Sequence, residues 1–231
     1  MHIGSFSRRT TASSVSRTAL WCSVVLLGMS AVMIAKSASA EMYIAGQVGY
    51  AMPLDLSNIK GTGNSSGITS TDLALESGIA YGIKIGGYFP GAAKWLGLEF
   101  EGFYNQPDVK SQTATLTPGG LQQVEGTKLR VAHFALNVLA RYPGEIFQPY
   151  VGVGGGVNVA DIAATPNTFS DDFTTAPAFN ALAGLRVFFT ERLALFGEFK
   201  YNQSTFKFSD NEFQAKYQTT MFMGGLSFHF K

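Results

Sequence analysis

The chain has 231 residues, of which 46% are hydrophobic and 14% charged, with a formal net charge of +1 and a single cysteine. Soluble domains usually carry about 25% charged residues, so this chain is poor in charge. One cysteine excludes an intramolecular disulfide framework, and the small net charge offers no basic excess that would attract nucleic acid.

Residues 1–40 have the composition of a secretory signal peptide. The segment contains four basic residues and no acid, and its apolar run at residues 19–35 is followed by the small-x-small sequence ASA at residues 38–40. We expect Sec-type export and cleavage before Glu41; an N-terminal membrane anchor is the alternative, because the run is near the length that spans a bilayer. The remaining part, 41–231, keeps 13 of the 17 Lys and Arg residues and all 16 acids, a net charge of −3.

Residues 41–231 are predicted to form eight strands. They are rich in Val, Ile, Phe, Tyr and Gly and alternate with period 2, whereas helical periodicity is poor. The predicted strands are 42–52, 76–89, 95–105, 126–142, 149–160, 176–189, 192–203 and 214–230. No apolar run in this part is long enough for a spanning helix.

The connections between these strands alternate between short and long. Tight turns occupy residues 89–94, 142–145 and 189–192, and long polar loops occupy 53–74, 106–125, 161–175 and 204–213. In an antiparallel meander every second connection lies at the same end, so the turns and the loops would separate to opposite ends. This asymmetry is typical of an outer-membrane barrel with short periplasmic turns and long outer loops.

The two faces of the strands differ in bulk and polarity. In the strand 95–105, Leu98 and Phe100 share one face, and Glu99 and Glu101 share the other. Alternation alone leaves two interpretations: a soluble lipocalin-like barrel with the apolar face inside, and a membrane barrel with the polar face inside. The interior of an eight-stranded barrel is only wide enough for its side chains, so the bulk of the apolar face favours the membrane barrel.

Seven charged residues on the polar face are expected to meet inside the barrel. They are Lys84, Glu99, Glu101, Arg141, Arg186, Glu198 and Lys200. Buried charges need partners, so these four bases and three acids would form a lumenal ionic network that also blocks solute flow. As an alternative, Glu99 and Glu101 would be the acid/base pair of a hydrolase, although no substrate cleft is apparent beside them.

Little other chemistry is present in residues 41–231. His133 and His229 are far apart in the strand pattern, which makes a poor metal site, and we interpret them as a wall residue and an interfacial polar residue. The sequence GVGGGVN at residues 152–158 lies inside a strand with no following helix, so it predicts small packing residues rather than a phosphate loop. We expect neither a cofactor nor a metal.

Aromatic residues gather near both ends of the predicted strands, as in the interfacial girdles of membrane barrels. Near the short turns they are Phe89, Trp95, Tyr142, Phe147, Tyr150, Phe228 and Phe230. Near the long loops they are Tyr50, Tyr104, Tyr201, Phe206 and Phe208.

Three short motifs stand near the start, the middle and the end of this region. They are EMYIAGQVGYAMP at residues 41–53, WLGLEFEGFYN at 95–105, and GLSFHF at 225–230, with Gly225, Phe228 and Phe230. Together they resemble the small outer-membrane β-barrel family, which includes the OmpA transmembrane domain and the opacity-type surface antigens. The resemblance implies an all-β, eight-stranded antiparallel up-and-down transmembrane barrel in the outer membrane of a Gram-negative cell. It also implies that the last motif is read by the barrel-assembly machinery.

The function we expect is that of a non-enzymatic surface protein with a structural role and an adhesion or host-interaction role through its long loops. The first two loops are rich in Gly, Ser, Thr, Asn and Gln, so we expect them to be mobile and hydrated. The third carries Asp161, Asp171 and Asp172, for which a calcium site is an alternative to a solvated loop.

Three other functions stay open for the chain. One is a small pore, for which a barrel of ten strands would leave space; the others are a soluble lipocalin-like binding barrel and a lipid-modifying enzyme that depends on His133. The expected partners are outer-membrane lipid and lipopolysaccharide, periplasmic chaperones, the barrel-assembly machinery and an unidentified host or surface ligand, with no nucleic acid.

Overall fold

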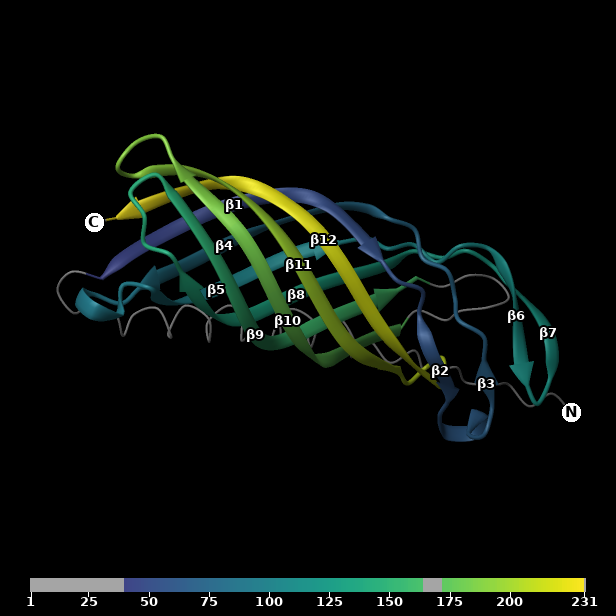
Figure 1. Ribbon diagram of the computed structural model, residues 1–231. Helices are drawn as coiled ribbons and strands as arrows, with labels where there is room; N and C mark the ends of the chain where they lie inside the picture. Colours follow the sequence, from purple (N-terminus) through teal and green to yellow (C-terminus); the bar gives the residue numbers. More distant parts are fainter. Residues whose placement is uncertain (1–39, 164–171, 231) are drawn as a thin grey trace, which may run out of the picture. The chain divides into compact units, whose positions relative to one another are not determined.

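A computed structural model describes residues 40–163 and 172–230, so nearly all of the predicted signal peptide, Asp171 and Lys231 lie outside the described residues. Eight long antiparallel strands of the described part close into a barrel (Figure 1). They are β1 (Glu41–Pro53), β4 (Gly78–Tyr88), β5 (Leu96–Asn105), β8 (Leu129–Arg141), β9 (Phe147–Ile162), β10 (Asp172–Phe188), β11 (Leu193–Phe208) and β12 (Phe213–Phe230). Pairing of β12 with β1 closes the sheet and confirms the predicted eight-stranded barrel.

Four short strands fold the two largest loops. β2 (Ser57–Gly61) and β3 (Thr69–Ser70) lie between β1 and β4, and β6 (Gln112–Thr117) and β7 (Gly120–Val124) lie between β5 and β8. They continue the sheet beyond β12 in the order β2, β3, β6, β7, and Figure 1 shows them past the end of the barrel opposite the C-terminus. We call this folded region the cap. Because these strands do not enter the closed wall, the alternative of a ten-stranded barrel is wrong.

The cap is ordered because it shares an apolar core with the adjoining end of the barrel, which we call the cap core. The loops contribute Leu56, Ile59, Leu73, Leu75, Val109, Ala114 and Val124, and the barrel contributes Leu129, Val131, Ala160, Ile162, Ala176, Phe206, Phe208, Ala215 and Tyr217. Each large apolar side chain buried here contributes about 1.5–3 kcal/mol, which offsets the entropy lost by ordering the loops. The first two loops are therefore folded, while most of their polar side chains remain exposed to solvent, as their composition predicts.

The outer surface of the barrel wall is an apolar band. Its side chains remain largely exposed, with Ile83 at 72%, Ile79 at 67% and Val48 at 59%. Within residues 40–163 and 172–230 no helix is long and apolar enough to cross a membrane. The helical turns in these ranges are η2 (Gly63–Ser65) and η3 (Gly91–Ala93).

Three of the aromatic residues assigned to the girdles point inward instead. Tyr150 is 3% exposed because it follows the lumenal phase of Gly152 on β9. Phe206 and Phe208 are at most 1% exposed because β11 continues in phase past its predicted end at residue 203. The girdle residues Trp95 and Tyr142 do lie outside, at 50% and 68% exposure.

Candidate functional site

Five of the seven predicted lumenal charges form one buried cluster in the middle of the barrel. Lys84 Nζ lies 2.7 Å from Glu198 Oε2, 3.1 Å from Glu99 Oε1 and 3.8 Å from Glu101 Oε2. Lys200 Nζ contacts Glu101 Oε2 and lies 3.0 Å from Glu198 Oε1. All five side chains are nearly inaccessible to solvent. The two ammonium groups thus bridge three carboxylates across the lumen.

The strand register explains why these residues meet. Lys84 on β4 is the direct partner of Glu101 on β5, and Glu99 lies two residues away on the same face. Glu198 and Lys200 have the same i, i+2 relation on β11, on the other side of the closed wall. The closure of the barrel brings the two pairs together, and their separation in sequence reaches 114 residues for Lys84 and Glu198.

Neutral side chains complete the hydrogen bonding of the three carboxylates. Tyr43 Oη donates to Glu99 at 2.6 Å, and Tyr150 Oη donates to Glu198 at 2.8 Å. Asn137 Nδ2 and Asn180 Nδ2 donate to Glu101 Oε1 at 3.0 and 2.5 Å. Buried carboxylates are stable only when their acceptor oxygens are occupied in this way.

A glycine makes room for this polar layer. A Cβ on Gly154 would lie 2.1 Å from Asn137 Oδ1 and 2.4 Å from the Leu136 carbonyl oxygen. The glycine-rich sequence of β9 therefore serves lumenal packing at this position, as its place inside a strand predicts.

Arg186 is in the lumen but outside the cluster of salt bridges. Its guanidinium carbon lies 4.3 Å from the ring centre of Tyr43 and 5.3 Å from that of Tyr150. Arg186 Nη1 also donates a hydrogen bond to Tyr88 Oη at 3.4 Å. Arginine is the cation best suited to such a site, because it is weakly hydrated and stacks on aromatic rings.

Arg141 forms a separate ion pair near the short-turn end. Its Nη2 lies 2.6 Å from Glu41 Oε2, and His229 Nδ1 lies 2.7 Å from Glu41 Oε1. The seven predicted residues did not include Glu41, although the inward phase of Tyr43 two residues later also places Glu41 on the lumenal face. With Glu41 added, the predicted set of lumenal charges becomes four acids and four bases.

A layer of amides lies between the charge cluster and the cap core. His133 Nδ1 contacts Asn158 Oδ1 and lies 3.1 Å from Asn202 Nδ2. Asn158 Nδ2 also donates to Asn202 Oδ1 at 2.8 Å and to Ser204 Oγ at 2.9 Å. The lumen is therefore filled by charges, then amides, then the apolar cap core.

The residues of the predicted assembly signal lie on both faces of β12. Phe228 and Phe230 point outward at 39% and 49% exposure, with ring centres 5.0 Å apart. Gly225 points inward, where a Cβ would lie 2.0 Å from the Gly46 carbonyl oxygen. The register pairs Phe230 with Met42, so the signal forms part of the barrel seam.

Two of the third-loop acids, Asp161 and Asp172, engage protein groups. Asp161 pairs with Arg130 at 3.2 Å, and Asp172 accepts the backbone N–H groups of Asp210 and Asn211 at 2.8 and 3.2 Å. Among the described residues no group of three or more His, Cys, Asp or Glu side chains is arranged to hold a metal ion.

Comparison with known proteins agrees with this geometry. A family model described as outer membrane protein beta-barrel domain matches residues 22–230. The crystal structure of Neisserial surface protein A superposes with a TM-score of 0.52 at 15% identity, over 83% of this chain and 99% of that chain. Ail of Yersinia pestis gives 0.45 at 14% identity, over 83% and 99%, and OprG of Pseudomonas aeruginosa gives 0.49 at 14%, over 83% and 96%. No curated protein matches this sequence.

The family match includes every strand of the closed barrel, and the solved neisserial structure has the same fold. The external apolar band and the polar lumen are the arrangement required of a barrel in lipid. The chain belongs to the outer membrane protein beta-barrel domain family, and it is a small barrel of the bacterial outer membrane.

Proposed function

We propose that this barrel is a non-enzymatic surface protein that supports the outer membrane and binds a host or surface ligand through its cap. The observation that carries the proposal is the contrast between the two parts of the molecule. The lumen is filled by side chains at three successive levels, whereas the loops beyond it are folded into a sheet. A rigid barrel that presents ordered loops is a common scaffold for recognition.

The filled lumen argues against the alternative of a small pore. Lys84, Glu101 and Lys200 lie across its middle and are buried by one another. Opening a path would require breaking these contacts, and separating a buried ion pair costs about 3–5 kcal/mol. The same burial argues against Glu99 and Glu101 as an acid/base pair, because a substrate does not reach them. His133 is likewise fully buried by the amide layer, which disfavours the lipid-modifying enzyme.

The cap offers a recognition surface at its outermost hairpin. In the hairpin of β6 and β7, Leu121 is 78% exposed and its neighbours Gln122 and Gln123 are also exposed. Within the described residues β7 pairs only with β6, so its other edge leaves backbone N–H and C=O groups for a ligand. Because the cap core holds the base of this hairpin in place, its surface is preorganised for binding.

Adhesion of bacteria that produce the full chain tests the proposal. Replacing residues 112–124 by a short Gly-Ser turn removes the hairpin, and we expect attachment to host cells to fall to the level of bacteria without the protein. A matched variant with Gly-Ser in place of 91–93 at the short-turn end should keep attachment. Unchanged attachment by the first variant, with the barrel intact by heat-dependent gel mobility, would refute recognition through the hairpin.

Export and assembly form part of the same proposal. We infer that the Sec route exports the chain, that periplasmic chaperones hold it, and that the barrel-assembly machinery reads β12 through Phe228 and Phe230. Support comes from the outward aromatic pair at the barrel seam. Alanine at both positions should lower the amount of heat-modifiable barrel in the outer membrane, while an equal change at Phe199 and Phe222 should not.

A further inference from the structure

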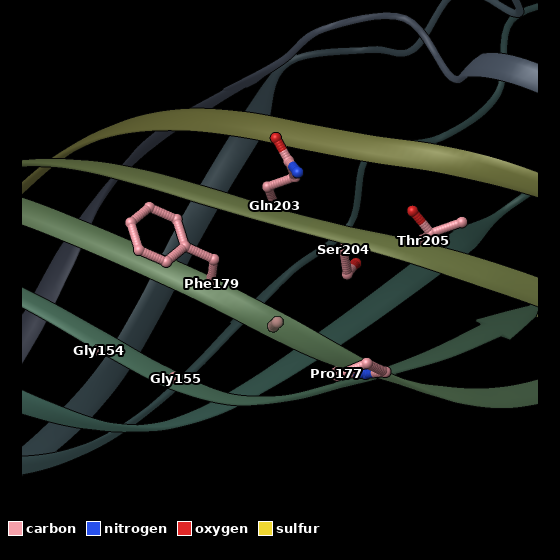
Figure 2. A pocket seen from close by; sticks show the side chains of 8 residues that line it. Gly154, Gly155, Pro177, Phe179, Gln203, Ser204 and Thr205 are labelled. Carbon is pink, nitrogen blue, oxygen red and sulfur yellow. The ribbon is translucent and has the colours of Figure 1, made fainter.

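The outer wall has a hollow of about 360 Å³ across β9, β10 and β11. Figure 2 shows Phe179 and Pro177 on β10, between the glycines Gly154 and Gly155 of β9 and the side chains of Gln203 and Thr205 on β11. Gly155 faces outward in register with Phe179, which is 50% exposed. The missing side chain thus leaves a depression in the apolar band beside an aromatic ring.

On β11 and β12, the outward side chains change from apolar to polar and then to basic toward the long-loop end. Along the outward face of β11, Phe199 is followed by Tyr201, Gln203, Thr205 and Lys207. Along β12, in the same direction, Phe222 is followed by Thr220, Gln218 and Lys216. The register pairs Thr205 with Lys216, so both lysines stand next to a residue that lines the hollow.

The two lysines of this face, Lys207 and Lys216, flank the turn between β11 and β12, which carries Asp210 and Glu212. Within the described residues neither Lys207 nor Lys216 takes part in a salt bridge, whereas Arg130 on β8 pairs with Asp161. The carboxylate of Glu212, in the turn between β11 and β12, accepts hydrogen bonds from Asn64 and Ser65 at 2.8 and 3.1 Å.

Between the lysines and the hollow, hydrogen bonds fix the orientation of the Gln203 side chain. Gln203 accepts from Tyr201 Oη at 2.7 Å and from Gln218 Nε2 at 3.2 Å, both through Oε1. This arrangement orients the amide and leaves its Nε2 to donate outward. A ligand that fits here has an apolar chain at one end, hydrogen-bond acceptors in the middle and an anionic group at the other end.

We propose that this face binds a phosphorylated lipid of the outer leaflet. An acyl chain occupies the hollow at Gly155 and Phe179, the polar linkage of the lipid accepts from Gln203 and Thr205, and the phosphate lies between Lys207 and Lys216. Charge complementarity and the order of the groups along the strands select this occupant. A soluble anion would leave the apolar hollow empty, and an uncharged lipid would leave the two lysines without an anionic partner.

Binding of lipid A to the refolded barrel in zwitterionic detergent, measured by native mass spectrometry, tests the proposal. The variant Lys207→Gln/Lys216→Gln should bind about 25-fold more weakly, since each lysine near an anionic headgroup contributes roughly fivefold. The control Lys110→Gln/Lys128→Gln removes the same charge from exposed lysines elsewhere and should bind within about twofold of wild type. Equal weakening in both would show general attraction and overturn the proposal.

Two further measurements distinguish the parts of the site. Gly155→Phe fills the hollow, and its Cβ has only an ordinary contact of 3.8 Å with the Ala178 carbonyl oxygen, so the fold should tolerate it. We expect about tenfold weaker lipid A binding, the equivalent of losing roughly two buried methylenes. Unchanged binding would overturn the placement of the chain. Inorganic phosphate should not compete with lipid A; full competition would assign the lysines to a soluble anion instead.

Discussion

Removal of the Lys200 ammonium should destabilise the barrel more than any loss of a surface charge. In Lys200→Met the side-chain length is kept while Glu101 and Glu198 each lose a cation. At the 3.0 Å separation from Glu198, the Coulomb energy is roughly 5–6 kcal/mol for an effective dielectric constant of about 20. Lys84, at 3.8 Å from Glu101, and the Asn180 amide compensate part of the loss. We therefore expect a cost of about 3–5 kcal/mol, the usual range for breaking a buried pair.

Urea unfolding of the barrel in lipid vesicles, followed by tryptophan fluorescence, measures this cost. The control Arg130→Met breaks the Arg130–Asp161 pair, whose side chains are 46% and 32% exposed, and should cost at most about 1 kcal/mol. The double variant Lys200→Met/Glu101→Gln should be more stable than Lys200→Met alone, because it also removes a carboxylate that has lost its nearer cation and keeps only Lys84 at 3.8 Å. A single Lys200→Met variant within 1 kcal/mol of wild type would refute the view that this cluster holds the lumen together.

Two other substitutions test the packing of the lumen and the cap. Gly154→Val should prevent formation of the heat-modifiable barrel, because its Cβ would overlap Asn137 and the Leu136 backbone. The control Gly197→Val meets open space and should fold normally. Equal yields of the two variants would contradict the role of Gly154 in lumenal packing. Phe206→Ala removes a fully buried ring from the cap core and should lower the stability of the cap by about 3–5 kcal/mol. We expect faster proteolysis of the first two loops on intact bacteria, with the barrel undisturbed. Unchanged protection of the loops would contradict a core shared between the cap and the barrel.

The sequence predicted the membrane barrel well because its strand signals are local. Period-2 alternation and the alternation of turns with loops set the number of strands and the face on which Glu99 and Glu101 lie. The phase of each strand also placed Lys84, Glu198 and Lys200 inside. Tyr150 is near a strand end, which predicts a girdle position, but the alternation of its neighbours on β9 places it in the lumen.

The cap could not be predicted by the same reasoning. Its apolar residues, such as Leu56, Leu73 and Val109, each follow an aspartate and stand in stretches too short to set a strand period. They become a core only when two loops far apart in the sequence fold over one end of the barrel, where Leu129 and Phe208 meet them. Composition therefore indicated hydrated loops, whereas packing produced a sheet.

The amino-acid sequence by itself determined the wall of this protein: how many strands there are, which side of each faces lipid, and which charges enter the lumen. These properties depend on the spacing of neighbouring residues along one strand. Only the tertiary structure decided which charges pair. Arg141 binds Glu41 and Arg186 stacks on tyrosines, while the lysines gather the carboxylates, because closure of the barrel sets the distances between residues on non-adjacent strands. The same closure, through long-range contacts that no local pattern records, turned the polar loops into a folded cap.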